Sequence, residues 1–236
     1  MTTQPAVEAY RRIARVYDAA LNPVTSLERR VLAGMLPEMR GLRVIDVGAG
    51  TGYWAAHCSA LGAHAVAIDA CWEMLQSARG HRVVGDALCL PVRDGAADVV
   101  ICSLMLGYAR AAFTELARVV KPGGALFVTD LHPDALARGW ERSFRVGDEI
   151  VRPSFEIYAI DELRCDSLQR TRLVEAPFAE PERALFQQAG YKREPCERST
   201  APERPRGRST RRFAASSQTE SKRLSCSVRR HVTIWQ

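Results

Sequence analysis

The sequence predicts an α/β fold with a Rossmann-like, mostly parallel sheet and helices on both faces. Short runs rich in Val and Ile alternate with helical patterns, which is typical of βαβ units. A turn with three glycines, at positions 48, 50 and 52, separates the first apolar run from the helix that follows. With 236 residues, 47% of them hydrophobic, the chain can bury the core of one such domain.

Two helices are expected before the first strand, and we assign residues 1–40 to an N-terminal helical cap. They cover Val7–Tyr17 and Ser26–Leu36. Ser26 could cap the second helix, with Arg29 and Arg30 on its outer face.

Residues 41–192 form the predicted core. Its strands are expected over Arg43–Val47, Ala63–Ile68, Arg82–Val84, Ala97–Cys102 and Ala125–Thr129. The run ADVVIC is almost continuously apolar, as central parallel strands are. The helices between the strands are expected over Tyr53–Ala60, Trp72–Arg79 and Ala111–Val120, the last of which ends at KPGG because Pro and Gly cannot continue it.

The pattern weakens after the fifth strand. Residues 131–176 lack a clean period, which favours an insertion that covers a ligand cleft, and Glu180–Ala189 follows as a helix with Gly190 as its C-cap. Residues 193–236 are rich in Ser and Arg, and we interpret them as a disordered tail, with a basic arm and an aberrant C-terminus as alternatives. Apart from Ser227–Trp235, this tail does not indicate strands, so the C-terminal part of the sheet is predicted to be incomplete.

The distribution of charge, apolar residues and cysteines argues against several classes of function. The tail holds 11 Lys and Arg against 4 Asp and Glu, whereas the preceding 192 residues hold 22 against 23, so the core itself does not indicate nucleic-acid binding. No apolar run reaches the roughly 18 residues that a membrane crossing needs. The N-terminus lacks a secretory pattern, and seven scattered cysteines without a CxxC pair indicate packing roles in a reducing, cytoplasmic setting.

The strongest chemical signal is the segment VIDVGAGTGYWA. Glycines allow a sharp turn and let a ligand approach main-chain N–H groups, and the following helix adds the positive end of its dipole. A dinucleotide site would require G-x-G-x-x-G, but Tyr53 occupies the position of its last glycine. Asp69, 21 residues after Gly48, could accept hydrogen bonds from a ribose diol, or it could cap the next helix.

Four segments in order resemble the class I S-adenosylmethionine-dependent methyltransferases, especially the group that acts on small molecules. They are VIDVGAGTGYWA, AIDACWEML, GDALCLP and LARVVKPGGALFVTDLHP. The resemblance implies S-adenosylmethionine as cofactor, with Met74 beside the adenine, Asp86 at the adenine amino group and Tyr17 in a cover. The implied cofactor contacts are Tyr17, Asp46, Gly48, Ala49, Gly50, Gly52, Asp69, Ala70, Met74, Asp86, Ala87 and Ser103.

Methyl transfer from a sulfonium is an in-line displacement, so positioning and exclusion of water matter most. Ligands of open α/β sheets lie beyond the carboxyl ends of the strands. His132 is the candidate base or orienting group there, and Tyr108 could bind the substrate. Ser103 stands where a metal-dependent relative would place an acid, so no metal is expected.

We therefore expect methyl transfer to O, N or C of a small organic metabolite. An RNA-directed methyltransferase that uses the basic tail is the first alternative, and a catalytically silent cofactor-binding or scaffold protein is the second. The sequence does not identify the acceptor or the oligomeric state.

Overall fold

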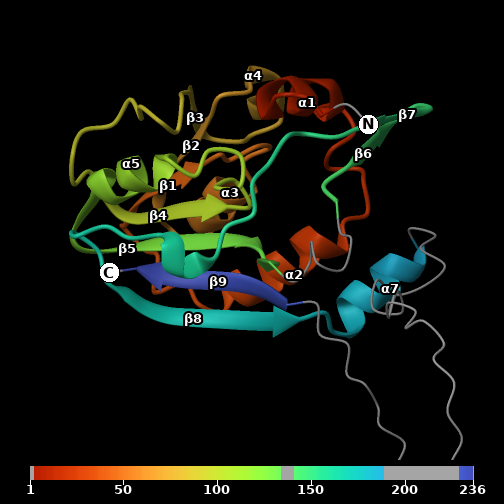
Figure 1. Cartoon of the computed structure of the whole chain (residues 1–236). Helices are drawn as coiled ribbons and strands as arrows, with labels where there is room; N and C mark the ends of the chain where they lie inside the picture. Colours follow the sequence, from red (N-terminus) through yellow and green to blue (C-terminus); the bar gives the residue numbers. More distant parts are fainter. Residues whose placement is uncertain (1–2, 134–140, 189–228, 236) are drawn as a thin grey trace, which may run out of the picture.

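The computed structural model describes residues 3–133, 141–188 and 229–235. It contains a seven-stranded sheet in the order β3-β2-β1-β4-β5-β9-β8 (Figure 1). The first five strands run parallel, which confirms the predicted fold class. Their bounds are β1 Arg43–Val47, β2 His64–Asp69, β3 His81–Val84, β4 Ala97–Ser103 and β5 Val120–Leu131.

Both faces of the sheet are packed, because residues along each central strand alternate between two apolar clusters. In β4, Val100 and Cys102 join the cluster beneath helix α5 (Ala112–Val119). Val99 and Ile101 join the cluster on the other face, against helix α3 (Tyr53–Ala60). This two-sided burial explains the continuous apolar run in the sequence. Of the described cysteines, Cys58, Cys71 and Cys102 are buried.

The N-terminal helices are α1 (Ala6–Ile13) and α2 (Pro23–Ala33). The predicted start of α2 at Ser26 is wrong: Pro23 occupies the first turn, and the Asn22 carboxamide oxygen accepts hydrogen bonds from the Val24 and Thr25 amides at 3.0 and 3.3 Å. Figure 1 shows α1 beside the short helix α4 (Trp72–Leu75), above the sheet edge formed by β2 and β3.

The sheet is not left incomplete at its C-terminal end, and the strand indicated within Ser227–Trp235 is confirmed over Arg229–Trp235. Strand β9 (Arg229–Trp235) lies antiparallel between β5 and β8 (Arg170–Pro177), with backbone pairs such as Thr129↔Val232 and Val174↔Val232. Residues 229–235 of the predicted disordered tail therefore form a strand; the rest of that tail and Gly190 lie outside the described residues. The edge strand β8 starts inside the predicted insertion, and its run RTRLVEAP is too polar to indicate a buried strand.

The segment between β5 and β8 contains a small hairpin of β6 (Phe144–Val146) and β7 (Glu149–Val151), followed by the 3-10 turn η1 (Ile160–Glu162). Helix α7 (Glu180–Gln188) then packs on α2. There the Arg30 guanidinium lies 3.0 Å from the fully buried carboxylate of Glu182. Among the described helices, none combines the length and apolar character needed to cross a membrane.

Candidate active site

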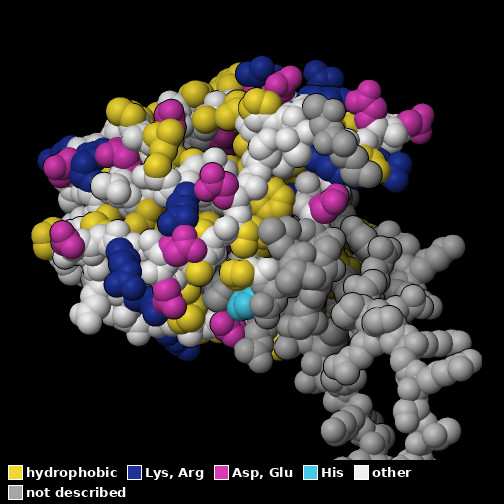
Figure 2. Space-filling model, viewed as in Figure 1, with side chains coloured by type: hydrophobic (Ala, Val, Ile, Leu, Met, Phe, Trp, Pro, Cys, Tyr) yellow, Lys and Arg dark blue, Asp and Glu magenta, His cyan; other side chains and the backbone are white. Residues whose placement is uncertain are grey.

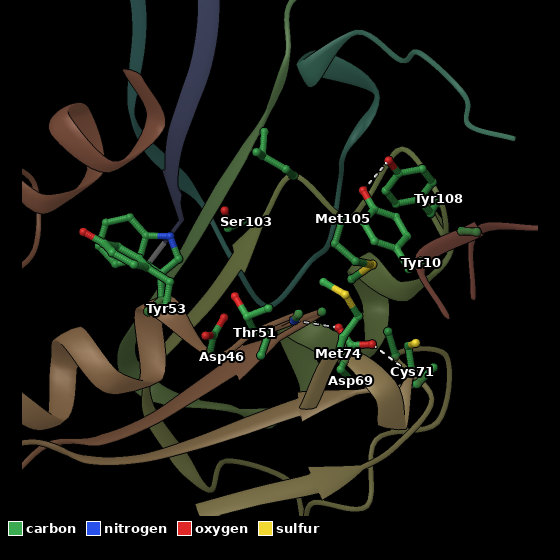
Figure 3. A pocket seen from close by; sticks show the side chains of 18 of the residues that line it. Tyr10, Asp46, Thr51, Tyr53, Asp69, Cys71, Met74, Ser103, Met105 and Tyr108 are labelled. Carbon is green, nitrogen blue, oxygen red and sulfur yellow. Dashed lines mark hydrogen bonds between the residues drawn. The ribbon is translucent and has the colours of Figure 1, made fainter. Parts of the chain in front are cut away.

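A cavity of about 210 Å³ lies at the carboxyl ends of β1, β2 and β4, beneath the N-terminal helices (Figure 3). Its floor is the glycine turn and the end of β2, and the loops after β3 and β4 form two of its walls. Helices α1 and α2 contribute Tyr10, Thr25, Glu28 and Arg29. The cavity therefore occupies the position expected for a ligand of an open α/β sheet.

Glycine is required at two positions of the turn, both by the backbone conformation and by the lack of space for a side chain. Gly48 has φ +66°, and a Cβ built there would lie 2.3 Å from Met105 Cγ. Gly52 has φ +78°, and its Cβ would lie 2.6 Å from the Cβ of Ala78 on the far side of the turn. The absence of a side chain at Gly48 thus leaves space for a ligand at the base of the cavity. At Gly52 it permits close packing between the turn and Ala78.

Several main-chain amides of the glycine turn already donate hydrogen bonds within the protein, whereas the sequence analysis expected a ligand to approach them. The Gly48 and Ala49 amides donate to the carbonyl oxygen of Ile68, at 2.8 and 3.1 Å, and the Gly52 amide donates to the Ala49 carbonyl. The Gly50 amide donates to Asp69 Oδ2 at 2.8 Å. The glycines therefore serve mainly to let a ligand approach closely, and side chains carry more of the polar recognition.

Asp69 is not the cap of the following helix, since Cys71 is the N-cap residue of α4. Its Oδ1 accepts a hydrogen bond from the Cys71 amide at 2.8 Å, while its Oδ2 holds the Gly50 amide. A carboxylate has about four acceptor positions, so capacity for further donors remains. Burial raises the pKa of Asp69, and the two amide bonds oppose that shift.

Asp46 contributes a buried acceptor without a partner. Its side chain is almost fully buried, and Oδ2 accepts a hydrogen bond from the Ala55 amide at 3.0 Å. Oδ1 has no hydrogen-bond partner among the described residues. Burial, with the nearby charge of Glu28, raises the pKa of Asp46 to about 7. An unpaired buried carboxylate oxygen is costly, and it favours a ligand that brings a donor.

This pKa gives a pH-dependent prediction. A carboxyl group whose pKa is raised on folding binds more protons in the folded state, so it makes folding less favourable as pH rises from about 4 to 7. The Asp46→Asn variant lacks this titration. Its ligand-free melting temperature should therefore exceed that of the wild type by more at pH 8 than at pH 5, as measured by thermal denaturation. An equal difference at both pH values would contradict the buried, titrating carboxyl.

Glu28 is a site residue that the sequence analysis missed. It is buried, and its Oε1 accepts hydrogen bonds from Trp54 Nε1 at 2.9 Å, Ser103 Oγ at 2.8 Å and Thr129 Oγ1 at 3.3 Å. These bonds tie α2 to α3, β4 and β5, and so fix the N-terminal cover over the cavity. Only the helical spacing of Thr25, Glu28 and Arg29 could have indicated a shared inner face.

The predicted outer position of Arg29 is wrong as well. Arg29 lies on the same face of α2 as Thr25 and Glu28, at positions i+4, i and i+3, and it lines the cavity with them. Its guanidinium carbon lies 3.6 Å from the centre of the Tyr53 ring, at the start of α3. Arg30 does lie on the exposed side.

Aromatic side chains from two elements meet at the other end of the cavity. The hydroxyl groups of Tyr10 on α1 and Tyr108 after β4 lie 2.8 Å apart (Figure 3), and the rings of Tyr10 and Tyr17 are 6.0 Å apart. Burial raises the pKa of Tyr17 to about 12, so this phenol stays neutral at physiological pH. Behind Tyr108, the buried Arg142 guanidinium pairs with Asp130 and donates to the Leu104 carbonyl at 2.6 Å.

A family model described as a methyltransferase domain matches residues 45–128. This range runs from β1 into β5 and contains the glycine turn, Asp69 and Asp86. Residues 45–128 are a methyltransferase domain of the class I, S-adenosylmethionine-dependent type.

Curated relatives of this methyltransferase domain differ in what their names say they act on. The chain is 30% identical over 150 residues to a malonyl-[acyl-carrier protein] O-methyltransferase of Yersinia pestis, covering 59% of this chain and 56% of that protein. It is 36% identical over 138 residues to a demethylmenaquinone methyltransferase of Corynebacterium kroppenstedtii, covering 51% and 60%. The chain thus spans little more than half the length of these relatives.

The fold of the methyltransferase also occurs in solved structures. A S-adenosylmethionine dependent methyltransferase from Mesorhizobium loti superposes with a TM-score of 0.58 and 17% identity, over 89% of this chain and 98% of the other. At this identity the likeness concerns the fold alone.

Most residues expected to contact the cofactor line the same cavity of the methyltransferase. They are Tyr17, Asp46, Gly48, Ala49, Gly50, Asp69, Ala70, Met74, Asp86, Ala87 and Ser103, joined by the candidate catalytic residue Tyr108. Gly52 does not line this cavity but borders a neighbouring hollow. Asp86 Oδ1 accepts a hydrogen bond from the Leu88 amide at 2.9 Å.

The other candidate catalytic residue, His132, does not line the cavity. Its Nε2 lies 3.4 Å from Oε1 of Glu175 on β8. This pairing exists because β9 and β8 extend the sheet beyond β5. Of these two strands, the sequence indicated only β9. None of the described residues of the 131–176 segment lines the cavity either; the N-terminal helices cover it instead.

Proposed function

We propose that the protein transfers a methyl group from S-adenosylmethionine to a small, uncharged organic acceptor. The observation that carries this proposal is the arrangement of Asp46, Asp69 and Asp86, which stand at or just beyond the ends of three neighbouring strands around one cavity. All three belong to the methyltransferase domain.

The residues present fit the cofactor. The unpaired Oδ1 of Asp46 suits an ammonium donor, and the remaining acceptor positions of Asp69 suit a ribose diol. Met74 and Ala87 offer apolar contacts to a purine ring, with Asp86 beside them. The low floor at Gly48 leaves room for the chain between nucleoside and amino acid.

When bound, the cofactor supplies a methyl group on a sulfonium, whose thioether product is a good leaving group. The protein's contribution is to hold the acceptor in line and to exclude water. Tyr10, Tyr17 and Tyr108 form an aromatic end of the cavity, where burial keeps the phenols of Tyr10 and Tyr17 protonated by raising their pKa. Neutral hydroxyls can orient an acceptor by hydrogen bonds without carrying charge to it.

This aromatic end favours one class of acceptor. Beside the three tyrosines, its lining residues are Ala6, Val7, Met105 and Ala109, and none of these side chains is charged. A carboxylate acceptor, as the name of the Yersinia relative implies, would meet no Lys or Arg side chain among these lining residues. A flat, uncharged ring with a nucleophilic carbon or hydroxyl packs well against tyrosine and methionine side chains.

The two alternative functions gain no support from the described structure. The hypothesis of a silent scaffold rested on an incomplete sheet, but the sheet has seven strands. On the face shown in Figure 2, Lys and Arg side chains are interspersed with Asp and Glu. That face therefore carries no continuous basic surface of the kind that RNA binding needs, and most of the basic tail on which the RNA hypothesis rested lies outside the described residues.

The experiment is a transfer assay with the full chain and S-adenosylmethionine carrying a labelled methyl group. Two acceptor panels are compared: reduced quinones and phenols, and malonyl thioesters. We expect label in products of the first panel only. Transfer to the malonyl thioesters alone would overturn the proposed acceptor class. If the cofactor binds but label passes to neither panel, or if it passes to RNA instead, the small-molecule function is overturned.

A further inference from the structure

Arg29 is the one Lys or Arg side chain among the described residues that line the main cavity. The same cavity is lined by several acids, among them Glu28, Asp46 and Asp69. No carboxylate of the described residues lies within ion-pair distance of Arg29, whereas Arg30 and Arg142 are each paired. A partly buried guanidinium without a counter-ion is well suited to receive an anion from a ligand.

The position of the guanidinium is fixed by stacking. Its carbon lies 3.6 Å from the centre of the Tyr53 ring; Arg29 belongs to α2, and Tyr53 is the first residue of α3. Stacking occupies the face of the guanidinium and leaves its N–H edges for hydrogen bonds. A carboxylate can accept two of these bonds side by side, which a lysine in the same place could not provide.

The location along the cavity indicates which part of a ligand is involved. Figure 3 shows Tyr53 on one side and Asp69, Met74 and Cys71 on the other, with Asp46 and Thr51 between them. If the ribose lies at Asp69 and the purine at Met74, the amino-acid part extends past Asp46 toward Tyr53.

We propose that Arg29, held against Tyr53, binds the α-carboxylate of the cofactor's methionine part and makes the site select ligands that carry it. This inference rests on the proposed function. In it, Asp46 receives the ammonium group and Arg29 the carboxylate of the same zwitterion. Because Arg29 is the one Lys or Arg among the described lining residues and Glu28 and Asp46 line the same cavity, its removal would leave the ligand carboxylate without a counter-ion. The loss should therefore be larger than that of a hydrogen bond alone.

The test is calorimetry of S-adenosylhomocysteine and of 5′-methylthioadenosine, which keeps the nucleoside and thioether but lacks the amino-acid group. Arg29→Gln should weaken S-adenosylhomocysteine binding about 10- to 100-fold and change 5′-methylthioadenosine binding less than about twofold. Arg29→Lys should recover part of the lost affinity, because it restores the charge but not the stacked, two-pronged geometry.

Arg30→Gln is the matched control, since it removes the same charge one residue further along α2, outside the cavity. It can lower the melting temperature by unpairing Glu182, but affinity for both ligands should stay at the wild-type value. The proposal is overturned if Arg29→Gln binds S-adenosylhomocysteine as the wild type does, or if both ligands weaken equally. If the wild type binds neither ligand, the proposed function itself fails.

Discussion

Replacing Gly48 by alanine should abolish S-adenosylhomocysteine binding, with a loss of more than about 100-fold. The added Cβ would lie 2.3 Å from Cγ and 2.7 Å from Cβ of Met105, so the backbone of one of the two loops has to move. The positive φ of +66° adds strain for any residue with a side chain. Both effects raise the floor of the cavity into the space of the ligand. Calorimetry on the purified variant, with circular dichroism to check folding, measures the loss.

Gly41→Ala is the control for backbone strain alone. Gly41 has a similar φ of +74°, but a Cβ there would meet nothing within 4 Å. This variant should lose only about 1 kcal/mol of stability and keep its affinity. If Gly48→Ala binds S-adenosylhomocysteine within twofold of the wild type, the cavity above the glycine turn is not the cofactor site.

Asp69→Ala should weaken S-adenosylhomocysteine binding by about 1–3 kcal/mol, or roughly 5- to 150-fold. The carboxylate is the acceptor proposed for the ribose hydroxyls, and it also holds the Gly50 and Cys71 amides in place. Asp69→Asn keeps the size and one acceptor oxygen, so it separates loss of charge from loss of shape. Its affinity should fall between that of the wild type and Asp69→Ala.

Asp18→Asn provides a comparison outside the cavity. Asp18 accepts a hydrogen bond from the Thr51 hydroxyl at 2.9 Å and borders the neighbouring hollow, but it does not line the main cavity. Its affinity for S-adenosylhomocysteine should match that of the wild type. If Asp69→Ala lowers only the melting temperature and leaves affinity unchanged, Asp69 has a purely structural role.

The parts of the fold that depend on residues close together in the sequence were predictable from it. Strands β1 to β5 carry their own apolar signal, and the turn at Gly48 and the acid Asp69 lie within segments that fold locally. Apart from Tyr17, the residues predicted to contact the cofactor come from these strands and the segments that follow them, and all of the predicted contacts except Gly52 line one cavity.

What failed depends on contacts between distant segments. Strand β8 is polar because it lies at an edge, and β9 pairs with it across more than fifty residues. The position of His132 outside the cavity lining could not be predicted for the same reason, since its neighbour Glu175 belongs to β8. Glu28 and Arg29 were missed because the inward face of α2 is set by its contacts with α3, β4 and β5, which are distant in the sequence.

Calorimetric titration of the wild-type chain with S-adenosylhomocysteine, beside parallel titrations with NADH and FAD, is the most direct measurement. We predict saturable binding of one S-adenosylhomocysteine per chain and no binding of either dinucleotide. Absence of S-adenosylhomocysteine binding at millimolar concentration, together with uptake of NADH or FAD by the folded protein, would contradict the assignment of this cavity to S-adenosylmethionine.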